Sequence, residues 1–241
     1  MDKLIFTAMS GAERAWHAQQ VHANNLANLE TPGFRADLEL AVGYEVPGYG
    51  YDARYMSRLQ ANTFATREGA LQATGRDLDV AIVGEGYFAV QWLDGEAYTR
   101  AGAMTLDAEG MLLINGHPVL GDAGPIVLPQ FVSLSIGQDG VILIQAPGQE
   151  DLQPVDRFKL VNAEAGRLTK NEAGLIVTRD GVPLAADETV RVRSGYLEGS
   201  NVSAIEEMIA TMHLNREFEL QMKLFSAADT MVEAGNRLLR G

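Results

Sequence analysis

Apolar residues recur at helical spacing near both ends of the chain and at strand spacing in between. In residues 2–29 they step by alternating threes and fours, which is typical of a coiled-coil seam rather than of a broad amphipathic face. Pro32 and Gly33 then form a helix stop and a turn. At 1.5 Å per residue the predicted helix is roughly 40 Å long. Its seam consists of Ile5, Ala8, Ala12, Ala15, Gln19, His22 and Leu26.

A second long helix is predicted from about Ser203 onward. Ser203 and Glu206 have the spacing of a capping box, and Gly235 is the only glycine or proline before Leu239. Its apolar stripe consists of Ile205, Met208, Met212, Phe218, Met222, Phe225, Val232 and Leu239. Both seams contain polar residues, and isolated helices are marginal in water. We therefore expect the two helices to pair as a coiled coil and to order fully only in an assembly.

Between residues 75 and 193 the apolar period changes to two. Short apolar runs alternate with turn dipeptides such as Asn115-Gly116 and Asp180-Gly181. This pattern predicts a mainly β central domain of many short antiparallel strands, flanked by the two long helices. The predicted strands are 80–83, 87–92, 111–114, 126–128, 132–136, 141–145, 158–161, 175–177 and 190–192.

The pattern divides the chain into four segments. They are an N-terminal helix and turn (1–34), an extended or irregular connector (35–74), an all-β domain (75–195) and a C-terminal helix (196–241). The connector contains a stretch rich in glycine and tyrosine at 43–51. Because so long a connection is uncommon inside a compact domain, we expect it to pack against a partner.

Composition narrows the possible functions. Hydrophobic residues make up 46% of the 241, enough for a core, and the net charge of -13 argues against nucleic acid or an anionic membrane surface as the main partner. The absence of cysteine excludes disulfides, zinc–thiolate sites and a cysteine nucleophile. The sequence has neither the roughly 18-residue apolar run of a membrane span nor the continuous apolar region of a signal peptide. We therefore expect no membrane span and no cleaved signal.

Few residues suggest catalysis or metal binding. Asp77 and Asp79 share a strand face, but no calcium-loop pattern follows them, so a turn at the strand entry is the favoured interpretation. The glycines at 84 and 86 lack the third glycine of a nucleotide-binding loop and indicate a bend. The four histidines show no metal-ligand spacing. We predict no catalytic, metal or cofactor site and no enzymatic activity.

Three asparagines, Asn24, Asn25 and Asn28, lie close together where the first predicted helix ends. Asparagine disfavours helix interiors because its side chain competes for backbone hydrogen bonds. One explanation is that Asn28 caps the helix and the other two side chains are solvated. The other is that their amides bond to neighbouring subunits and fix the register of an assembly.

Five stretches carry a resemblance. In order they are MDKLIFTAMSGA, ANNLANLETPGF, LDVAIVGEGYFAV, YTRAGAMTLDAEGML and SGYLEGSNVSAIEEM. Each is weak alone, but together they resemble the bacterial flagellar rod and hook family over nearly the whole chain, apart from residues 40–66. The opening residues and GDAGPI at 121–126 are most similar to the short proximal-rod members, with the distal-rod subunit as the close alternative.

The resemblance implies a structural subunit without cofactors. It implies export through the flagellar type III apparatus without a cleaved signal. It also implies polymerisation with itself and with proximal and distal rod subunits into a periplasm-spanning helical tube that transmits torque. The paired terminal helices would line the tube, with the β domain outside. Besides the two seams, the predicted assembly interface includes Asn24, Asn25, Asn28, Thr31, Pro32, Gly33, Phe34, Asn201 and Val202.

A function of another class stays open from the residues alone. A β-rich enzyme or carbohydrate-binding module with helical oligomerisation tails would share the same helix and strand pattern. That alternative predicts a ligand pocket within residues 75–193 and ordered termini in the isolated chain. The rod hypothesis predicts termini that are sensitive to protease.

Overall fold

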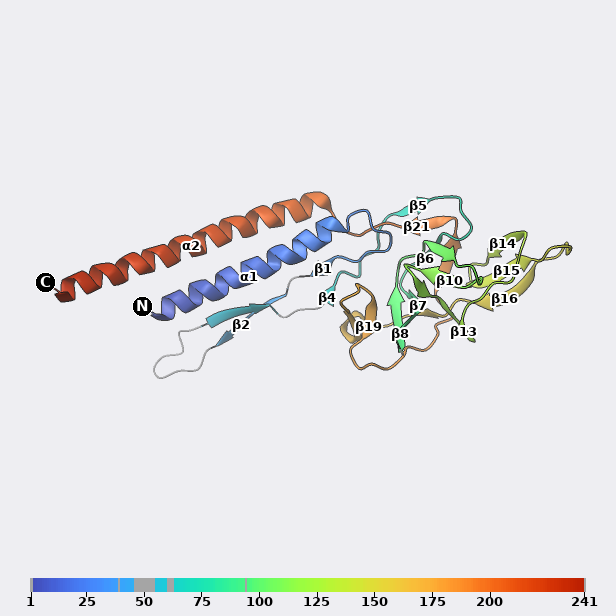
Figure 1. The fold of residues 1–241 in the computed structure, drawn as a ribbon, viewed down its shortest axis with the longest axis horizontal. Coiled ribbons are helices and arrows are strands. Elements are labelled where there is room, and N and C mark those ends of the chain that lie inside the picture. Colours follow the sequence, from blue (N-terminus) through green and yellow to red (C-terminus); the bar gives the residue numbers. More distant parts are fainter. Residues whose placement is uncertain (1, 39, 46–54, 60–62, 94, 241) are drawn as a thin grey trace. The chain divides into compact units, whose positions relative to one another are not determined.

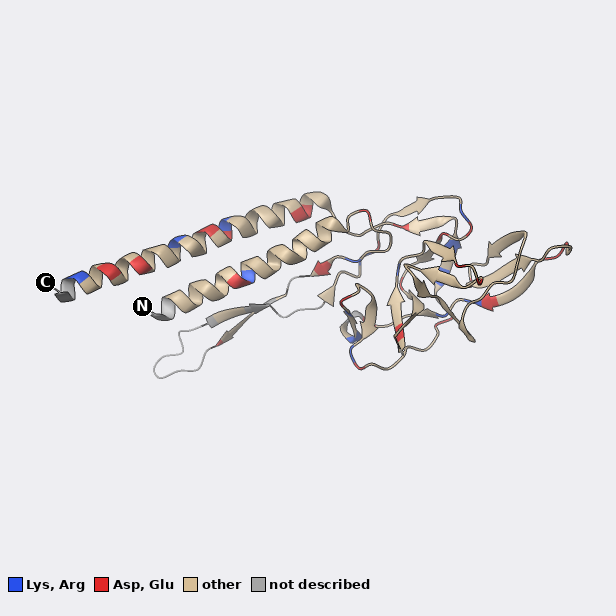
Figure 2. Ribbon diagram, in the orientation of Figure 1, with Lys and Arg blue, Asp and Glu red and all other residues tan. Residues whose placement is uncertain are grey.

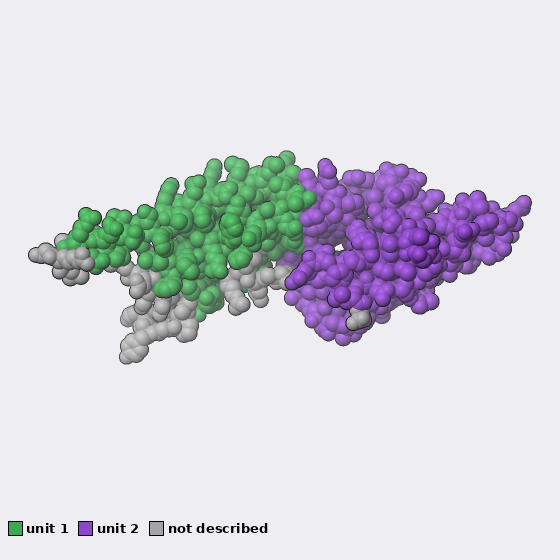
Figure 3. Space-filling model, in the orientation of Figure 1, with its two compact units in different colours: residues 1–27, 37–62, 203–241 green, residues 28–36, 63–202 purple. Residues whose placement is uncertain are grey.

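The computed structural model describes residues 2–38, 40–45, 55–59, 63–93 and 95–240. The chain forms two compact units, which Figure 3 colours separately. Unit 1 consists of residues 1–27, 37–62 and 203–241, and unit 2 consists of residues 28–36 and 63–202. The two ends of the sequence therefore belong to the same unit.

Two long helices dominate unit 1. Helix α1 spans Asp2–Ala27 and helix α2 spans Ala204–Arg240, and they lie side by side (Figure 1). The helices predicted at both ends are thus confirmed. Glu206 and Glu207 occupy the first turn of α2, where the helix dipole favours negative charge.

The remainder of unit 1 is short strands. Strand β1 (Asp37–Leu38) and strand β3 (Tyr55–Leu59) contact α1, and β3 pairs antiparallel with β2 (Ala41–Glu45). The sequence predicted an extended or irregular connector here. The described parts are extended, but they form a regular hairpin rather than irregular chain. Residues 39, 46–54 and 60–62 of the predicted connector lie outside the described residues.

Unit 2 is built from short strands and one 3-10 helix, η1 (Ala165–Arg167). The strands are β4 (Thr63–Phe64), β5 (Leu71–Ala73), β6 (Val80–Val83), β7 (Tyr87–Trp92), β8 (Gly95–Thr99), β9 (Met104–Leu106), β10 (Leu112–Ile114), β11 (His117–Pro118), β12 (Leu120–Gly121), β13 (Gly124–Pro125), β14 (Ser133–Ile136), β15 (Val141–Gln145), β16 (Gln153–Arg157), β17 (Leu160–Val161), β18 (Leu168–Lys170), β19 (Ile176–Thr178), β20 (Arg191–Ser194) and β21 (Tyr196–Glu198).

The sheets of unit 2 are small and antiparallel, as predicted. The largest has the order β17-β7-β8-β19-β18, and two three-stranded sheets have the orders β11-β10-β9 and β14-β15-β16. Pairs β12-β13, β20-β6 and β21-β5 complete the unit. Asn115 and Gly116 both have positive φ, 50° and 81°, which is the geometry of the tight hairpin turn that their sequence predicted.

Most predicted strands are present, but one is not. Residues 126–128 form no strand: Ile126 bonds to Val119 through its backbone amide, and Val127 makes only an isolated bridge to Met111. Ile126 and Leu128 are buried in the core, whereas Val127 between them is 51% exposed. That core includes Phe88 and Phe158, whose rings meet edge to face with centroids 5.7 Å apart.

Candidate assembly interface

The face through which α1 and α2 contact each other is built from small side chains. Ala15 and Ala18 are buried together with Leu214 of α2. A Cβ atom added to Gly11 would lie 2.9 Å from Nε2 of Gln221, so a side chain at this position would displace the end of Gln221. Since few large apolar side chains are buried here, this contact gains little from the hydrophobic effect.

Polar groups border this narrow contact and set its register. Arg14 forms an ion pair with Glu217, and Nδ1 of His22 contacts Oε2 of Glu207. Nδ2 of Asn25 donates to the other oxygen of Glu207, Oε1, at 3.1 Å. Arg14 precedes His22 on α1, whereas their partners follow the reverse order on α2, Glu207 before Glu217, so the helices run antiparallel.

The contact face of α1 departs from the predicted seam. Ala8 and Ala15 are buried as predicted, but Ala18 is buried too. Leu26 was predicted in the seam and is 36% exposed, whereas Asn25 beside it is 1% exposed. The hydrogen bonds of Asn25 select this register, because they need its amide on the inner side. The other predicted seam residues, Ile5, Ala12, Gln19 and His22, are half-buried.

Most of the predicted apolar stripe of α2 does not face α1. The described side chains that α2 buries are Leu214 and Ala228, and Val232 is half-buried. The side chain of Leu239 lies outside the described residues. The contact with α1 leaves six stripe residues exposed, and their place in the assembly interface stays a prediction; they are Ile205, Met208, Met212, Phe218, Met222 and Phe225.

Both helices thus present large apolar side chains to their surroundings. On α1 these include Phe6, Met9 and Trp16, each 57% exposed. Charged residues of both signs lie between the apolar ones along α2 (Figure 2). Soluble monomers rarely expose contiguous apolar patches of large size, and such patches commonly mark interaction surfaces. We call the exposed apolar residues of α1 and α2 the helix surface; it comprises Phe6, Met9, Trp16, Leu26, Ile205, Met208, Ile209, Met212, Phe218, Leu220, Met222, Leu224, Phe225 and Met231.

The asparagines at the end of α1 hold this unit together internally. Besides its bond to Glu207, the Asn25 amide donates to the backbone oxygen of Asp37 at 3.0 Å and accepts from the Asp37 amide at 2.8 Å. Asn24 donates to Oδ2 of Asp37 at 2.9 Å. The buried Asn25 side chain is satisfied within its own chain, which corrects the prediction that it bonds to a neighbouring subunit.

Asn28 and Thr31 end the helix locally. The backbone amide of Thr31 donates to the Asn28 carbonyl at 3.2 Å, and its hydroxyl donates to Oδ1 of Asn28 at 3.1 Å. This agrees with the capping explanation for Asn28. Pro32 is half-buried in the turn that follows.

Gly33 and Phe34 anchor the segment that leaves α1. Gly33 has φ +69°, and a Cβ atom there would lie 2.2 Å from the Ala101 amide, so only glycine fits. Its own amide donates to the Glu198 carbonyl at 2.8 Å. The ring of Phe34 lies 4.1 Å below the ammonium of Lys170, a cation–π contact.

Behind this turn lies a buried ionic network that the sequence analysis missed. Glu198 pairs with Arg35 at 2.7 Å through Oε1 and with Arg100 at 2.6 Å through Oε2, and all three side chains are at most 3% exposed. Arg100 also donates to the carbonyls of Gly84 and Gly86 at 2.7 and 2.8 Å. The bend predicted at these two glycines therefore serves to present carbonyls to Arg100.

Burial shapes the electrostatics of this network. Desolvation lowers the pKa of Arg35, and attraction to Glu198 opposes that shift. The charged residues that carry the network stand inside the stretches TPGFRA, YTRAGA and GYLEGS. A charge flanked on both sides by small and apolar residues was the available signal for their burial.

Asn201 joins three segments of unit 2. Its Oδ1 accepts from the Ala36 amide at 2.7 Å, and its Nδ2 donates to the carbonyls of Ala65 and Arg67 at 3.2 and 2.8 Å. Asn201 was predicted at the assembly interface, but it is buried and occupied within the chain, which corrects that assignment. Val202 beside it is half-buried.

The remaining candidates for chemistry have structural roles. Asp79 is buried and pairs with Arg76 at 2.5 Å, as a turn at the strand entry requires. Within the described residues, no group of three or more histidine, aspartate or glutamate side chains could hold a metal ion. No helix in the described part of the chain is long and apolar enough to cross a membrane.

Three family models match the chain. They describe the flagella basal body rod protein (residues 5–35), the D1 domain of the flagellar hook protein FlgE/F/G (81–144) and the C-terminal region of the flagellar basal body rod FlgEFG protein (193–238). The chain is also 40% identical to the flagellar basal-body rod protein FlgF of Escherichia coli K12, with 99% of both chains covered.

The chain belongs to the flagellar basal-body rod protein family. It is 39% identical to FlgF of Salmonella typhimurium over 99% of both chains. Identity to FlgG of Buchnera aphidicola (from Schizaphis graminum) is 30%, over 92% of this chain and 95% of that one. The resemblance read from the sequence is therefore confirmed, and it is closer to the F-type members than to this G-type one.

Proposed function

We propose that this protein is a structural subunit of the proximal rod of the flagellar basal body. Full-length identity of 40% to a protein named FlgF supports this assignment over the distal-rod alternative. The main structural support for assembly is the helix surface. Its large apolar residues stay exposed because α1 and α2 contact each other through small side chains.

Assembly follows from this arrangement. The helices of neighbouring subunits pack on the helix surface, so that each α1–α2 pair joins others in a coiled-coil-like bundle. The methionines of α2 suit such contacts, because thioether side chains adapt to neighbours that are not identical. The β unit supplies further contacts between subunits. The exported, periplasm-spanning and torque-transmitting character of the rod is part of this proposal, as is passage through the type III export apparatus.

Single charges on the helix surface test the proposal. Met212→Glu and Met222→Glu each place a charge on an exposed residue that the isolated chain does not use for packing. Ala227→Glu is the matched control, because it adds the same charge at an exposed position without removing a large apolar side chain.

The readouts are rod assembly and swimming in a strain that lacks its own copy, together with thermal unfolding of the purified monomer. We expect both methionine variants to unfold like the parent protein and to lose assembly, while Ala227→Glu assembles. Normal rods from Met212→Glu and Met222→Glu would contradict assembly through the helix surface.

A further inference from the structure

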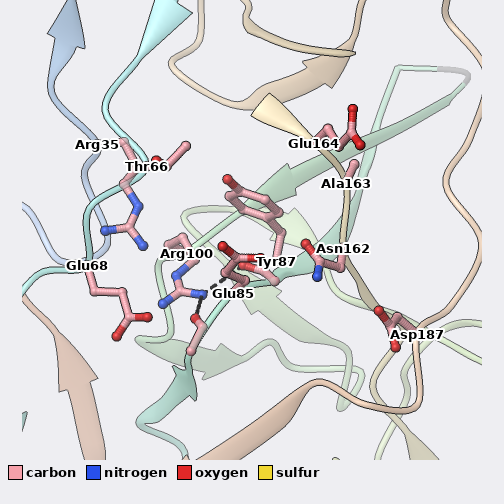
Figure 4. A pocket seen from close by; sticks show the side chains of 12 residues that line it. Arg35, Thr66, Glu68, Glu85, Tyr87, Arg100, Asn162, Ala163, Glu164 and Asp187 are labelled. Carbon is pink, nitrogen blue, oxygen red and sulfur yellow. Dashed lines mark hydrogen bonds between the residues drawn. The ribbon is translucent and has the colours of Figure 1, made fainter. Parts of the chain in front are cut away.

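A pocket of about 510 Å³ lies in unit 2. Volumes of this size are typical of ligand-binding pockets. Its lining combines three buried residues with polar groups, Arg35, Tyr87 and Arg100, with four carboxylates, Glu68, Glu85, Glu164 and Asp187 (Figure 4). The helix contacts do not account for this site.

The buried polar residues leave hydrogen-bonding capacity unused. Nε of Arg35 is buried and has no hydrogen-bond partner, although Nη1 of the same side chain contacts Glu198 and the Arg67 carbonyl. Tyr87 is 6% exposed, and its hydroxyl makes no hydrogen bond to any described residue. Figure 4 shows the Tyr87 ring in the middle of the lining residues, with its hydroxyl on the side where Arg35 and Thr66 lie.

These two groups are donors. Burial raises the pKa of Tyr87, so its phenol stays protonated and can donate. The Nε of a guanidinium can only donate. Nε of Arg35 is a buried donor without a partner, and buried donors are almost always paired in folded proteins, so an acceptor oxygen beside it is the group that this part of the pocket lacks.

The carboxylates select a different group. Glu68, Glu85 and Glu164 are exposed and Asp187 is half-buried, so the four surround the pocket on its solvent side. They outnumber the two arginine charges of the lining, and Glu198 already compensates part of those. A cleft with an excess of one sign attracts the opposite charge. Among the described residues the carboxylates do not cluster closely enough to hold a metal ion, which favours a larger organic cation.

We propose that this pocket receives a lysine or arginine residue of a neighbouring rod subunit. The backbone carbonyl of that residue accepts from the Tyr87 hydroxyl and Nε of Arg35, and its cationic side chain lies among the carboxylates. The identity of the donor as a neighbouring subunit rests on the proposed function. The chemistry of the pocket does not, so the two can be tested separately.

Binding to the purified full-length monomer tests the pocket without any polymerisation. Nα-acetyl-arginine amide carries both required groups, Nα-acetyl-norleucine amide lacks the charge, and Nα-acetyl-glutamate amide reverses it. Amide chemical shifts in ¹H–¹⁵N NMR spectra report where each compound binds. We expect the arginine compound to shift residues 84–87 and 162–164 with millimolar affinity, and the other two compounds to bind at least threefold more weakly.

Variants assign the effect to named groups. Tyr87→Phe removes only the hydroxyl and Glu85→Gln removes one charge, and each should weaken binding about threefold or more. Glu109→Gln, an exposed carboxylate outside the pocket, is the control and should change nothing. Equal or tighter binding of the glutamate compound, no shifts at 50 mM of the arginine compound, or binding unaffected by both variants would each overturn the proposed ligand.

The neighbouring subunit is tested in assembled rods. The chain has no cysteine, so Ala163→Cys, which leaves the four carboxylates in place, can carry a single amine-reactive cross-linker at the pocket. A cross-link to a lysine of another subunit supports the proposal. Rods that assemble without one, although the monomer binds the arginine compound, would refute a lysine of the neighbour as the occupant.

Discussion

Removing the charge of Glu198 is the most direct test of the buried network. Glu198→Gln keeps the size of the side chain but leaves Arg35 and Arg100 without their shared counter-ion. Breaking a buried ion pair by changing one partner costs about 3–5 kcal/mol, because an uncompensated charge stays in the interior. For a unit of about 150 residues this loss corresponds to a decrease in Tm of roughly 6–20 °C.

Removing one of the two arginines should not restore the stability that Glu198→Gln loses. Arg100 donates to the carbonyls of Gly84 and Gly86 as well as to Glu198. Adding Arg100→Met to Glu198→Gln therefore leaves two buried carbonyls unpaired, each at a cost of about 1–3 kcal/mol. We expect the double variant to be no more stable than Glu198→Gln.

The assay can follow unit 2 by itself. The two tryptophans lie in different units, Trp16 in α1 and Trp92 in β7. In a Trp16→Phe background, urea unfolding monitored by fluorescence reports on unit 2. The matched control is Glu188→Gln, which breaks an ion pair with Arg157 that is 3.8 Å long and exposed. Such pairs contribute about 0–1 kcal/mol.

The comparison with the control decides the outcome. If Glu198→Gln lowers the free energy of unfolding of unit 2 by no more than Glu188→Gln does, the network does not stabilise the fold as argued. A loss of several kcal/mol for Glu198→Gln alone supports it.

Three further predictions concern the helices and Tyr87. Gly11→Leu should separate α1 from α2 and lower their helical CD stability, whereas Gly235→Ala, where a Cβ meets nothing within 4 Å, should raise it by up to about 1 kcal/mol. Asn25→Ala should cost about 1–3 kcal/mol in urea unfolding of the monomer, and the exposed Asn24→Ala less than half of that; equal losses would contradict the internal role. Burial raises the pKa of Tyr87 in the folded chain, because the ionised phenolate is disfavoured there. The stability that the protonated side chain confers is therefore complete below about pH 10 and is lost as the pH rises further. Tyr87→Phe should flatten this decline of Tm at alkaline pH.

The sequence predicts elements well where burial follows a local period. Strands 80–83, 87–92 and 141–145 have the predicted bounds, because each is an apolar run between turn residues. Strand β16 was missed because its sequence QPVDR is mostly polar, and its side chains are exposed or half-buried. Such a strand exists because its neighbour β15 offers backbone partners, which no local pattern reveals.

The periodic pattern of the sequence could not predict the register of the two helices. Ala8, Ala12, Ala15 and Ala18 are equally small, so hydrophobicity cannot choose which of them face α2. The bonds of Asn25 to residues 37 and 207 make that choice, and those partners are distant in sequence. The flanking residues of Arg35, Arg100 and Glu198 indicate burial, but no local pattern shows that residues so far apart in sequence pair with one another.

Asn201 and the buried network connect the segments of unit 2 where the chain enters that unit. The chain passes between its two units near residues 27, 36, 62 and 202. Asn201 bonds to residues 36, 65 and 67, so one buried amide ties together the parts of unit 2 next to three of these passages. Glu198 adds the segment at Gly33 through its carbonyl. A load carried along any one connection is thus shared with the others at the point where it enters unit 2. Such sharing suits a subunit whose proposed role is to transmit torque, and it accounts for costly buried charges where simple apolar packing would suffice for folding.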